Sequence, residues 1–294
     1  MDIAEEKSVL RLIELAREED LGSGDLSSSL LPAPELPATF RLIAQEPGVL
    51  AGQRIALSVL RAYDPTIQLE WLEGVQDGLA WDDTPRALAS IRGPLGVVLS
   101  AERVLLNFLQ RLSGIATLTR RYVEAVAGTG AAILDTRKTT PGWRLLEKYA
   151  VRCGGGHNHR FGLYDAVLIK DNHLAGIPLN RLAGAVFEML NHLSSTGVRP
   201  AFVEVEADAP EQAEELFKVV GVDVILLDNF ALEDVVRIVQ RRGDLGLQGK
   251  IDLEASGGVD LRTVRALAEA GVERISVGAL THAARGLNLS LERD

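Results

Sequence analysis

Short apolar runs recur between residues 130 and 282, and this rhythm constrains the fold more than any other feature of the chain. Stretches of helical character separate the runs, for example at residues 211–219, 232–240 and 261–270. Buried strands of a parallel sheet have such near-continuous apolar sequences, because helices cover the sheet. Six units predict a parallel α/β architecture that begins to close into a barrel, slightly short of the usual eight strands. The runs lie at residues 132–134, 166–169, 201–203, 224–227, 251–253 and 275–277.

The sequence before about residue 113 has a mixed pattern instead. Apolar residues at helical spacing predict helices over residues 8–20, 54–62 and 101–112. Alternating apolar residues predict strands at residues 39–44, 67–71 and 87–91. This order is typical of a small α/β layer built on an antiparallel sheet. In the third helix, Val104 and Phe108 belong to the stripe that we expect to be buried, and Arg103 lies off that stripe. We therefore expect an N-terminal domain over residues 1–113 and a barrel domain over residues 114–282.

Every apolar run of the second half leads into polar residues. The carboxyl ends of parallel strands form the active face of α/β barrels, so polar residues there indicate function. One polar residue after a strand means little, but six consecutive runs with polar ends are hard to attribute to solvation alone. The polar ends are residues 135–138, 170–173, 204–206, 228–229, 256–258 and 278–279.

Two of these ends carry small residues that suit a phosphate group. Ser256, Gly257 and Gly258, and then Gly278 and Ala279, leave backbone N–H groups accessible at the start of the following helices. The last two strand-to-helix loops are the usual phosphate site of a barrel. The alternative is that these glycines only form tight turns.

Carboxylates at two neighbouring strand ends suit a hard cation. Glu204 and Asp228 are predicted to hold Mg²⁺ through water while the ion contacts phosphate oxygens, and a structural ion pair is the alternative. Zinc is disfavoured, because Cys153 and the three nearby histidines lack the spacing of zinc ligands. Those histidines are His157, His159 and His173.

The charge of the chain limits its partners. A net charge of −10 argues against binding to nucleic acid, and the basic residues that crowd positions 137–170 instead suggest a small anionic ligand, unless they are ordinary solvated charges. The single cysteine, Cys153, cannot form an intramolecular disulfide, which favours a reducing compartment. The acidic N-terminus and the lack of a long apolar run lead us to expect a soluble cytoplasmic protein without a leader or a membrane span.

Three long motifs make the chain resemble a known family. Residues 135–142 (DTRKTTPG), 154–160 (GGGHNHR) and 168–173 (LIKDNH) closely resemble the quinolinate phosphoribosyltransferase family of type II phosphoribosyltransferases. The resemblance covers nearly the whole chain, with further matches at residues 19–25, 46–52, 102–107, 203–206, 227–229, 254–258 and 276–278. It implies an α/β sandwich domain joined to an incomplete barrel of seven parallel strands, with residues 283–294 packed back on the sandwich.

The resemblance also implies an activity and an assembly. Members of the family transfer phosphoribosyl from phosphoribosyl pyrophosphate (PRPP) to quinolinate with loss of CO₂, a Mg²⁺-dependent glycosyltransferase reaction of NAD synthesis that yields nicotinate mononucleotide. They form homodimers in which the sandwich of one subunit caps the barrel of the other, and some assemble further into hexamers.

Individual roles follow from the matching motifs. The two carboxylates of quinolinate are assigned to Arg137, His159, Arg160 and Lys170, with Arg103 from the neighbouring subunit. Lys138 is assigned to the PRPP end of the site, and Glu204 and Asp228 to catalytic, metal-linked positions near the ribose. The 5′-phosphate is assigned to Ser256, Gly257, Gly258, Gly278 and Ala279.

Two alternatives stay open. The first is a paralogous phosphoribosyltransferase that has the same fold and another acceptor, and the full set of dicarboxylate-binding cations argues against it. The second is a non-catalytic protein that binds a phosphorylated metabolite. That protein would be expected to lack some of four residues that are all present here, namely Lys138, Lys170, Glu204 and Asp228.

Overall fold

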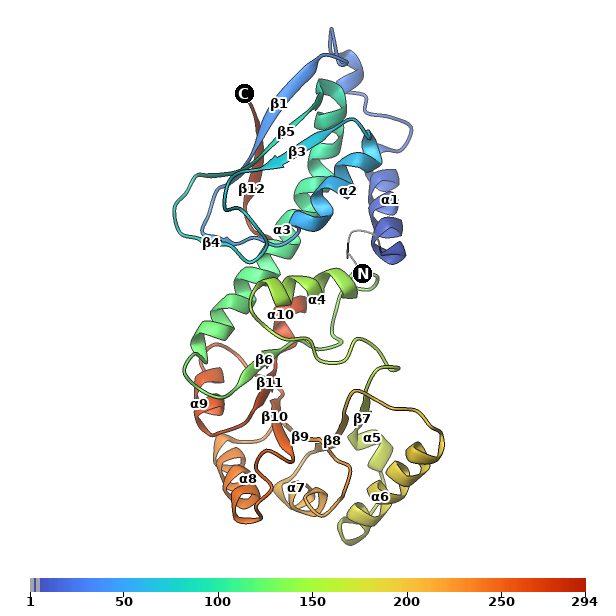
Figure 1. The fold of residues 1–294 in the computed structure, drawn as a ribbon, viewed down its shortest axis with the longest axis vertical. Helices are drawn as coiled ribbons and strands as arrows, with labels where there is room; N and C mark the ends of the chain where they lie inside the picture. The colour runs from blue at the N-terminus through green and yellow to red at the C-terminus, as the bar shows by residue number, and fades with distance from the viewer. Residues whose placement is uncertain (1–2, 4–5) are drawn as a thin grey trace. The chain divides into compact units, whose positions relative to one another are not determined.

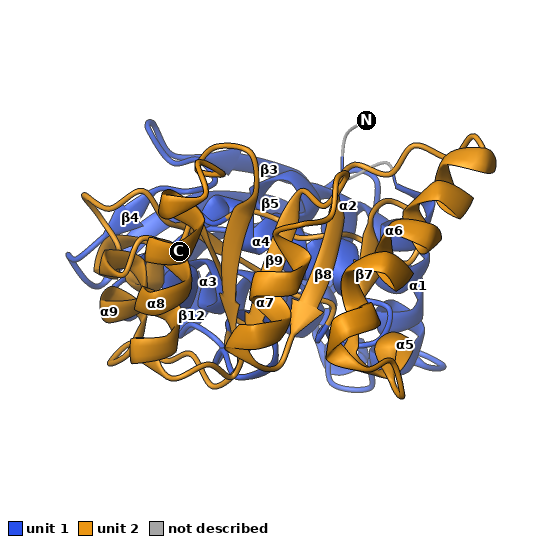
Figure 2. Ribbon diagram, turned by 90° about the horizontal axis from the view of Figure 1, so that it is seen from below, with its two compact units in different colours: residues 1–120, 138–156, 280–294 blue, residues 121–137, 157–279 orange. Residues whose placement is uncertain are grey.

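The chain forms two compact units in a computed structural model that describes residue 3 and residues 6–294. The first unit comprises Met1–Arg120, Lys138–Gly156 and Leu280–Asp294, and the second comprises Arg121–Arg137 and His157–Ala279 (Figure 2). One helix, α3 (Leu95–Ala125), continues through residue 113, where we expected the two domains to meet. The helix expected over residues 101–112 is thus much longer than its apolar stripe suggested.

The first unit is built on a four-stranded antiparallel sheet (Figure 1). The sheet has the order β12-β1-β5-β3, and its strands are β1 (Pro37–Ala44), β3 (Gln68–Trp71), β5 (Arg86–Pro94) and β12 (Leu289–Arg293). The three strands expected in the N-terminal region are confirmed as β1, β3 and β5. The C-terminal segment adds β12, which pairs with β1 and places Arg293 opposite Phe40.

Helices and short elements complete this unit. The expected helices are confirmed as α1 (Lys7–Leu21) and α2 (Gln53–Tyr63), and the N-terminal part of α3 buries its apolar stripe and exposes Arg103. The unit also contains η2 (Ser28–Leu30), β2 (Gly48–Val49), β4 (Ala80–Trp81) and α4 (Arg144–Cys153), and α10 (Ala279–His282) begins at the last residue of the second unit.

Residues 138–156 belong to the first unit, although we expected them in the barrel domain. Trp143 stacks on Phe108 of α3 with 4.8 Å between the ring centroids. Glu147 on α4 is buried and pairs with Arg111 of α3 at 2.7 Å. Both contacts link segments that are far apart in the sequence, so local patterns could not predict them.

The second unit is built on a parallel sheet with the order β6-β11-β10-β9-β8-β7. Its strands are β6 (Ala132–Leu134), β7 (Val167–Ile169), β8 (Val203–Ala207), β9 (Val224–Asp228), β10 (Asp252–Ser256) and β11 (Arg274–Ser276). Within the described residues the sheet has six strands, and a parallel bridge between Leu134 and His157 extends it by one residue beyond β6. The unit is therefore an incomplete barrel, with the expected seventh strand reduced to this bridge.

Helices cover the outer side of this sheet (Figure 1). They are α5 (Asp171–Leu174), α6 (Leu179–Ser195), α7 (Pro210–Leu216), α8 (Leu232–Asp244) and α9 (Val264–Glu269). The helical stretches expected near residues 211–219, 232–240 and 261–270 are confirmed as α7, α8 and α9. Helix α6 packs on α7, α7 on α8 and α8 on α9, and α7 also contacts β8 and β9.

The strands alternate more than their apolar runs indicated. In β8, Val203 and Val205 point to one face, and Glu204 and Glu206 point to the other. The charged residues Glu254 and Arg274 are in register with each other and share the face of Glu206. The interior face of the barrel therefore carries charged side chains together with apolar ones such as Leu226, which is in register with Glu206 and Glu254.

This alternation corrects one expected position. We placed Glu204 at the carboxyl end of its strand, but β8 starts at Val203 and runs to Ala207. Glu204 is therefore near the beginning of the strand, and Glu206 is near its end. The apolar run at residues 201–203 stops well before the strand ends at Ala207, because the glutamates of this strand face the barrel interior.

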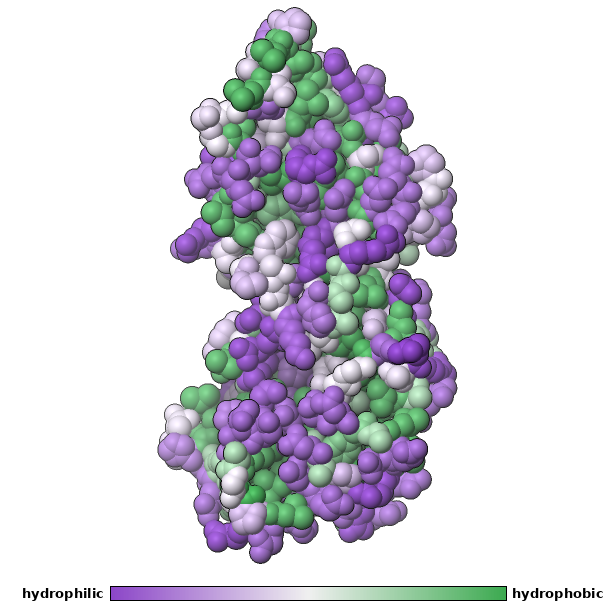
Figure 3. Space-filling view, turned by 180° about the vertical axis from the view of Figure 1, so that it is seen from behind, coloured by the Kyte–Doolittle hydropathy of each residue, from purple (hydrophilic) through white to green (hydrophobic). Residues whose placement is uncertain are grey.

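No helix within residue 3 and residues 6–294 is both long enough and apolar enough to cross a membrane. On the face drawn in Figure 3, hydrophilic and hydrophobic side chains are interspersed.

Candidate active site

A buried cluster of His159, Glu204 and Glu254 lies inside the barrel of the second unit. His159 Nε2 is 2.8 Å from Glu204 Oε2 and 3.4 Å from Glu254 Oε1. Both carboxyl groups are fully buried, and the ring of His159 is nearly so. The ring also meets Phe202 edge to face, with 5.3 Å between the centroids. The ring of His159 is thus contacted on several sides.

The hydrogen bonds of His159 fix its tautomer. Its Nδ1 accepts a hydrogen bond from the backbone N–H of Arg160 at 2.8 Å, so the proton of the neutral ring is on Nε2. A protonated Nε2 faces the two carboxyl groups and cannot bind a metal there. The cluster has the composition of a metal site, but the tautomer of His159 makes it an electrostatic cluster instead.

The two carboxyl groups perturb each other. Burial raises the pKa of Glu204 to about 7, although the charges of Arg274 and Arg160 oppose this shift. Burial and the charge of Glu204 likewise raise the pKa of Glu254. Both shifts favour the protonated form of these carboxyl groups relative to solvated ones.

A second acidic cluster lies at the carboxyl ends of β8 and β9. Carboxylate oxygens of Glu206, Asp208 and Asp228 are all within 4.8 Å of one another, and Glu206 Oε2 is 2.7 Å from Lys170 Nζ. Burial, then the charges of Asp171 and Asp228, raise the pKa of Asp208. Three hard oxygen donors that repel one another match what Mg²⁺ requires. The donor set thus fits the expected ion.

The structure does not bring Glu204 and Asp228 together as we expected. Ala207 is in register with Leu227, so Asp228 lies level with Asp208. Glu204 is four residues earlier on β8, which corresponds to about 13 Å along the strand. Glu206 therefore occupies the place that we assigned to Glu204. The sequence offered a signal for Glu206, since valine and glutamate alternate through residues 203–206 and so predict a strand that continues to the second glutamate.

Three cations lie near these acidic groups in the second unit. Arg160 is largely buried, and its Nη1 donates to the carbonyl of Ala166 at 3.3 Å. Burial, and next the charge of Arg137, lower the pKa of Arg160. Arg137 is exposed, and Lys170 is half-exposed at its pair with Glu206. Two neighbouring guanidinium groups that repel each other would be stabilised by a ligand with two negative charges.

Asp135 fixes the backbone beside these cations. Its Oδ1 accepts from the backbone N–H of His159 at 3.0 Å, and its Oδ2 accepts from Asn158 Nδ2 at 2.6 Å. Because Asp135 is fully buried, it orients the segment that carries His159 and Arg160.

The loops after β9 and β10 interlock. Asn229 has a φ of 57°, and its side chain donates to Asp228 Oδ2 at 2.8 Å. A side chain on Gly257 would place Cβ 2.1 Å from Asn229 Oδ1, so only glycine fits there. The space beside Gly258 is open. As expected, Ser256 is the last residue of β10, and Gly278 comes shortly after the end of β11. Ala279 is the first residue of α10. The predicted phosphate loops are thus at the carboxyl edge of the sheet.

Two of the predicted site residues, Arg103 and Lys138, belong to the first unit. Lys138 is exposed, and its carbonyl accepts from Thr281 Oγ1 at 2.7 Å. Arg103 is exposed on α3 and lines a cavity of about 350 Å³ together with Asp20 and Asp25.

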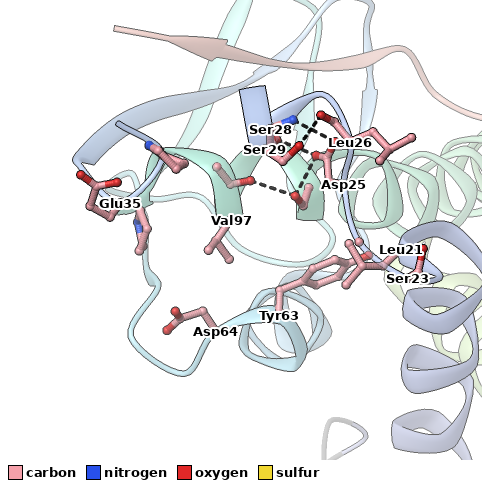
Figure 4. A pocket seen from close by; sticks show the side chains of 15 residues that line it. Leu21, Ser23, Asp25, Leu26, Ser28, Ser29, Glu35, Tyr63, Asp64 and Val97 are labelled. Atoms are coloured by element: carbon pink, nitrogen blue, oxygen red, sulfur yellow. Dashed lines mark hydrogen bonds between the residues drawn. The ribbon is translucent and has the colours of Figure 1, made fainter. Parts of the chain in front are cut away.

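A larger cavity of about 720 Å³ lies next to Asp25 in this unit (Figure 4). Asp25 accepts hydrogen bonds from Ser28 Oγ at 2.6 Å and Ser100 Oγ at 2.8 Å, and the hydrogen bonds from Ser28 and Ser100 lower its pKa to about 2. Asp25 thereby ties the segment after α1 to α3, close to Arg103.

Comparisons with known proteins agree with this architecture. An incomplete parallel barrel with cations and carboxylates at the carboxyl ends of its strands defines an α/β enzyme for an anionic substrate. The model of the quinolinate phosphoribosyl transferase N-terminal domain matches residues 25–113, and that of the C-terminal domain matches residues 115–292. The chain belongs to the quinolinate phosphoribosyl transferase family.

Individual relatives support the same assignment. A probable nicotinate-nucleotide pyrophosphorylase (carboxylating) of Bacillus subtilis is 38% identical over 93% of this chain and 89% of its own length. A decarboxylating quinolinate phosphoribosyltransferase of Nicotiana tabacum is 37% identical over 96% of this chain and 81% of its own length. The solved nicotinate-nucleotide pyrophosphorylase of Francisella tularensis is 35% identical and has a TM-score of 0.85, with 100% of this chain and 99% of that chain covered. The family and the fold class expected from the sequence are confirmed.

Proposed function

We propose that this protein transfers phosphoribosyl from PRPP to quinolinate with loss of CO₂, giving nicotinate mononucleotide and pyrophosphate. The proposal rests on one observation, which is that cationic and acidic side chains lie next to each other at one edge of the barrel. Arg137, Arg160 and Lys170 suit a dicarboxylate, and Glu206 and Asp228 suit a metal-bound pyrophosphate. The pair of Lys170 and Glu206 connects the two.

The reaction needs charge stabilisation rather than a protein nucleophile. As the bond from C1′ to pyrophosphate lengthens, positive charge grows on the ribose and negative charge grows on the leaving group. Glu206, Asp208 and Asp228 are the residues that would hold Mg²⁺, which when bound supplies charge neutralisation to the pyrophosphate. The same carboxylates stabilise the cationic ribose, and exposed Lys138 is assigned to the PRPP end of the site. Cys153 is no nucleophile, since burial raises its pKa to about 12.

Quinolinate supplies the rest of the chemistry. Arg137, Arg160 and Lys170 orient its two carboxylates so that the ring nitrogen attacks C1′. The resulting pyridinium withdraws electrons, so the bond between C2 and its carboxylate breaks, CO₂ leaves, and the electron pair left on C2 takes a proton from water. His159 was assigned to a carboxylate of quinolinate, but both of its ring nitrogens already face protein groups. We therefore give His159 the role of orienting Arg160.

We further propose a homodimer with shared sites, in which Arg103 completes the partner's dicarboxylate site. Arg103 is exposed on the side of α3 away from the buried stripe, so it is free to reach another subunit. A cytoplasmic location is proposed from the sequence and from the free thiol of Cys153.

Steady-state assays with purified protein, PRPP and Mg²⁺ test the proposed activity. Nicotinate has one carboxylate fewer than quinolinate and would leave a cation without its partner, so kcat/KM should favour quinolinate by about a hundredfold or more. Formation of nicotinate mononucleotide from quinolinate supports the proposal. Equal kcat/KM for the two acids, or no product from quinolinate, contradicts it.

A further inference from the structure

Arg274 is a charged residue inside the barrel that the proposed chemistry does not use. It lies on β11, beside Glu254 of β10 in the parallel register, and its side chain is 19% exposed. Its Nε donates to Glu254 Oε2 at 2.6 Å. Its guanidinium carbon is 5.0 Å from the centroid of the Phe202 ring. A planar cation thus contacts a buried carboxylate and an aromatic face at once.

Both contacts of Arg274 lead to His159. Glu254 Oε1 is 3.4 Å from His159 Nε2, and Glu204 Oε2 is 2.8 Å from the same nitrogen. On the other side, Phe202 meets the His159 ring edge to face. The ring of His159 therefore lies between two carboxyl groups and an aromatic ring, and Arg274 contacts one of those carboxyl groups, Glu254, and the aromatic ring of Phe202.

The position of His159 in turn affects Arg160. The backbone N–H of Arg160 donates to His159 Nδ1 at 2.8 Å, so a rotation of the ring breaks this bond. Arg160 is one of the residues to which we assign the carboxylates of quinolinate.

We propose that Arg274 is a positioning residue for the dicarboxylate site, acting through Glu254, Phe202 and His159 on Arg160. The proposal rests on the proposed function. Arg274 is the ion-pair partner of buried Glu254, and removal of one partner of a buried pair leaves a charge uncompensated. The two carboxyl groups would then separate and release the ring of His159.

Substitution of Arg274 tests this role through the two substrates separately. In R274M, the dissociation constant and KM for quinolinate should rise about tenfold or more, and those for PRPP should stay within about twofold of wild type. R265M is the matched control, because Arg265 is on an exposed helix face and pairs with Glu269 at 2.7 Å. Its loss should change neither the binding of quinolinate nor that of PRPP. Equal changes for both substrates, or unchanged quinolinate binding, would overturn the proposal.

If R274M does not fold, R274K takes its place. It keeps the charge and loses the planar stacking, so a rise of about threefold or more for quinolinate alone is expected, and no rise would overturn the proposal.

A spectroscopic measurement is independent of activity. In protein with ¹⁵N-labelled histidine, the His159 signals, identified with H159Q, should show a protonated Nε2 and an unprotonated Nδ1 in the wild type and in R265M. These signals should change in R274M or R274K. His159 signals that are identical in the Arg274 variants and the wild type contradict the positioning role. If the wild-type protein fails to bind and convert quinolinate, the proposed function is wrong, and the histidine signals alone then decide whether Arg274 positions His159.

Discussion

Glu204 and Glu206 are two residues apart on the same face of β8, yet they belong to different groups of side chains. Glu204 is fully buried and 2.8 Å from His159 Nε2, whereas Glu206 is 2.7 Å from Lys170 Nζ and within reach of Asp228. The two carboxyl groups therefore differ in their depth in the barrel. Glu204 contacts a buried histidine, and Glu206 lies among the candidate metal ligands.

This separation predicts opposite results for two equivalent substitutions. E206Q removes a hard metal ligand and the partner of Lys170, so kcat/KM should fall about a hundredfold or more and half-saturation should require more Mg²⁺. In E204Q the amide can replace the protonated carboxyl group beside Glu254, so activity should stay within about fivefold of wild type. Mg²⁺ titrations of both variants check this. A severe loss in E204Q together with near-normal E206Q would restore Glu204 as the metal-linked residue.

The raised pKa of Glu204 predicts a pH-dependent stability. The folded protein binds a proton more tightly than the unfolded chain, so the contribution of Glu204 to the free energy of unfolding falls as pH rises from about 4.5 to about 7. E204Q lacks this titration, so its stability relative to wild type should increase across the window. Urea unfolding of both proteins at pH 5 and pH 7.5 measures the difference. A difference that is independent of pH contradicts the shift.

Activity should depend on a divalent cation with a preference for oxygen ligands. Chelation should abolish turnover, and Mg²⁺ or Mn²⁺ should restore it, because the donors at the carboxyl edge are carboxylates. Metal analysis of the purified protein provides the control. Full activity after exhaustive chelation, or stoichiometric tightly bound zinc, would refute the magnesium assignment.

A shared site predicts complementation between two inactive proteins. R103A and K138A should each lose one to several orders of magnitude in activity, since each removes a charge-assisted contact. Under subunit exchange at equal mixing, at most about a quarter of normal activity should return, because about half of the subunits are in mixed dimers with one intact site each. No recovery, after mass spectrometry has confirmed mixed dimers, would place Arg103 in the site of its own subunit.

Local patterns predicted the elements but not their ends. The alternation in β1 and the stripe of α3 identified both elements, yet the helix was expected to end at Leu112, two residues before Gly114. This glycine ends no helix. A Cβ there would lie 1.9 Å from the carbonyl oxygen of Arg285, so glycine is required by a close approach of the C-terminal segment. Only the folded chain reveals such a contact.

The sequence motifs likewise pointed to only some of the residues of the candidate site. Arg137, Arg160, Lys170 and Asp228 were assigned from the family motifs that follow the strands, and these assignments stay predictions. Glu206 was missed, because which of two alternating glutamates lies at the edge depends on the register with β9. Arg274 was also missed, since its partner Glu254 is on the neighbouring strand, distant in sequence.

The fate of the two carboxylates of quinolinate tests the central claim most directly. Quinolinate labelled with ¹⁴C in either the C2 or the C3 carboxylate is incubated with the protein, PRPP and Mg²⁺. The C2 label should leave as CO₂, one for each pyrophosphate released, and the C3 label should remain in the nucleotide. No labelled CO₂ in the presence of PRPP, or release of the C3 label, would contradict the assignment of this chain as a decarboxylating phosphoribosyltransferase.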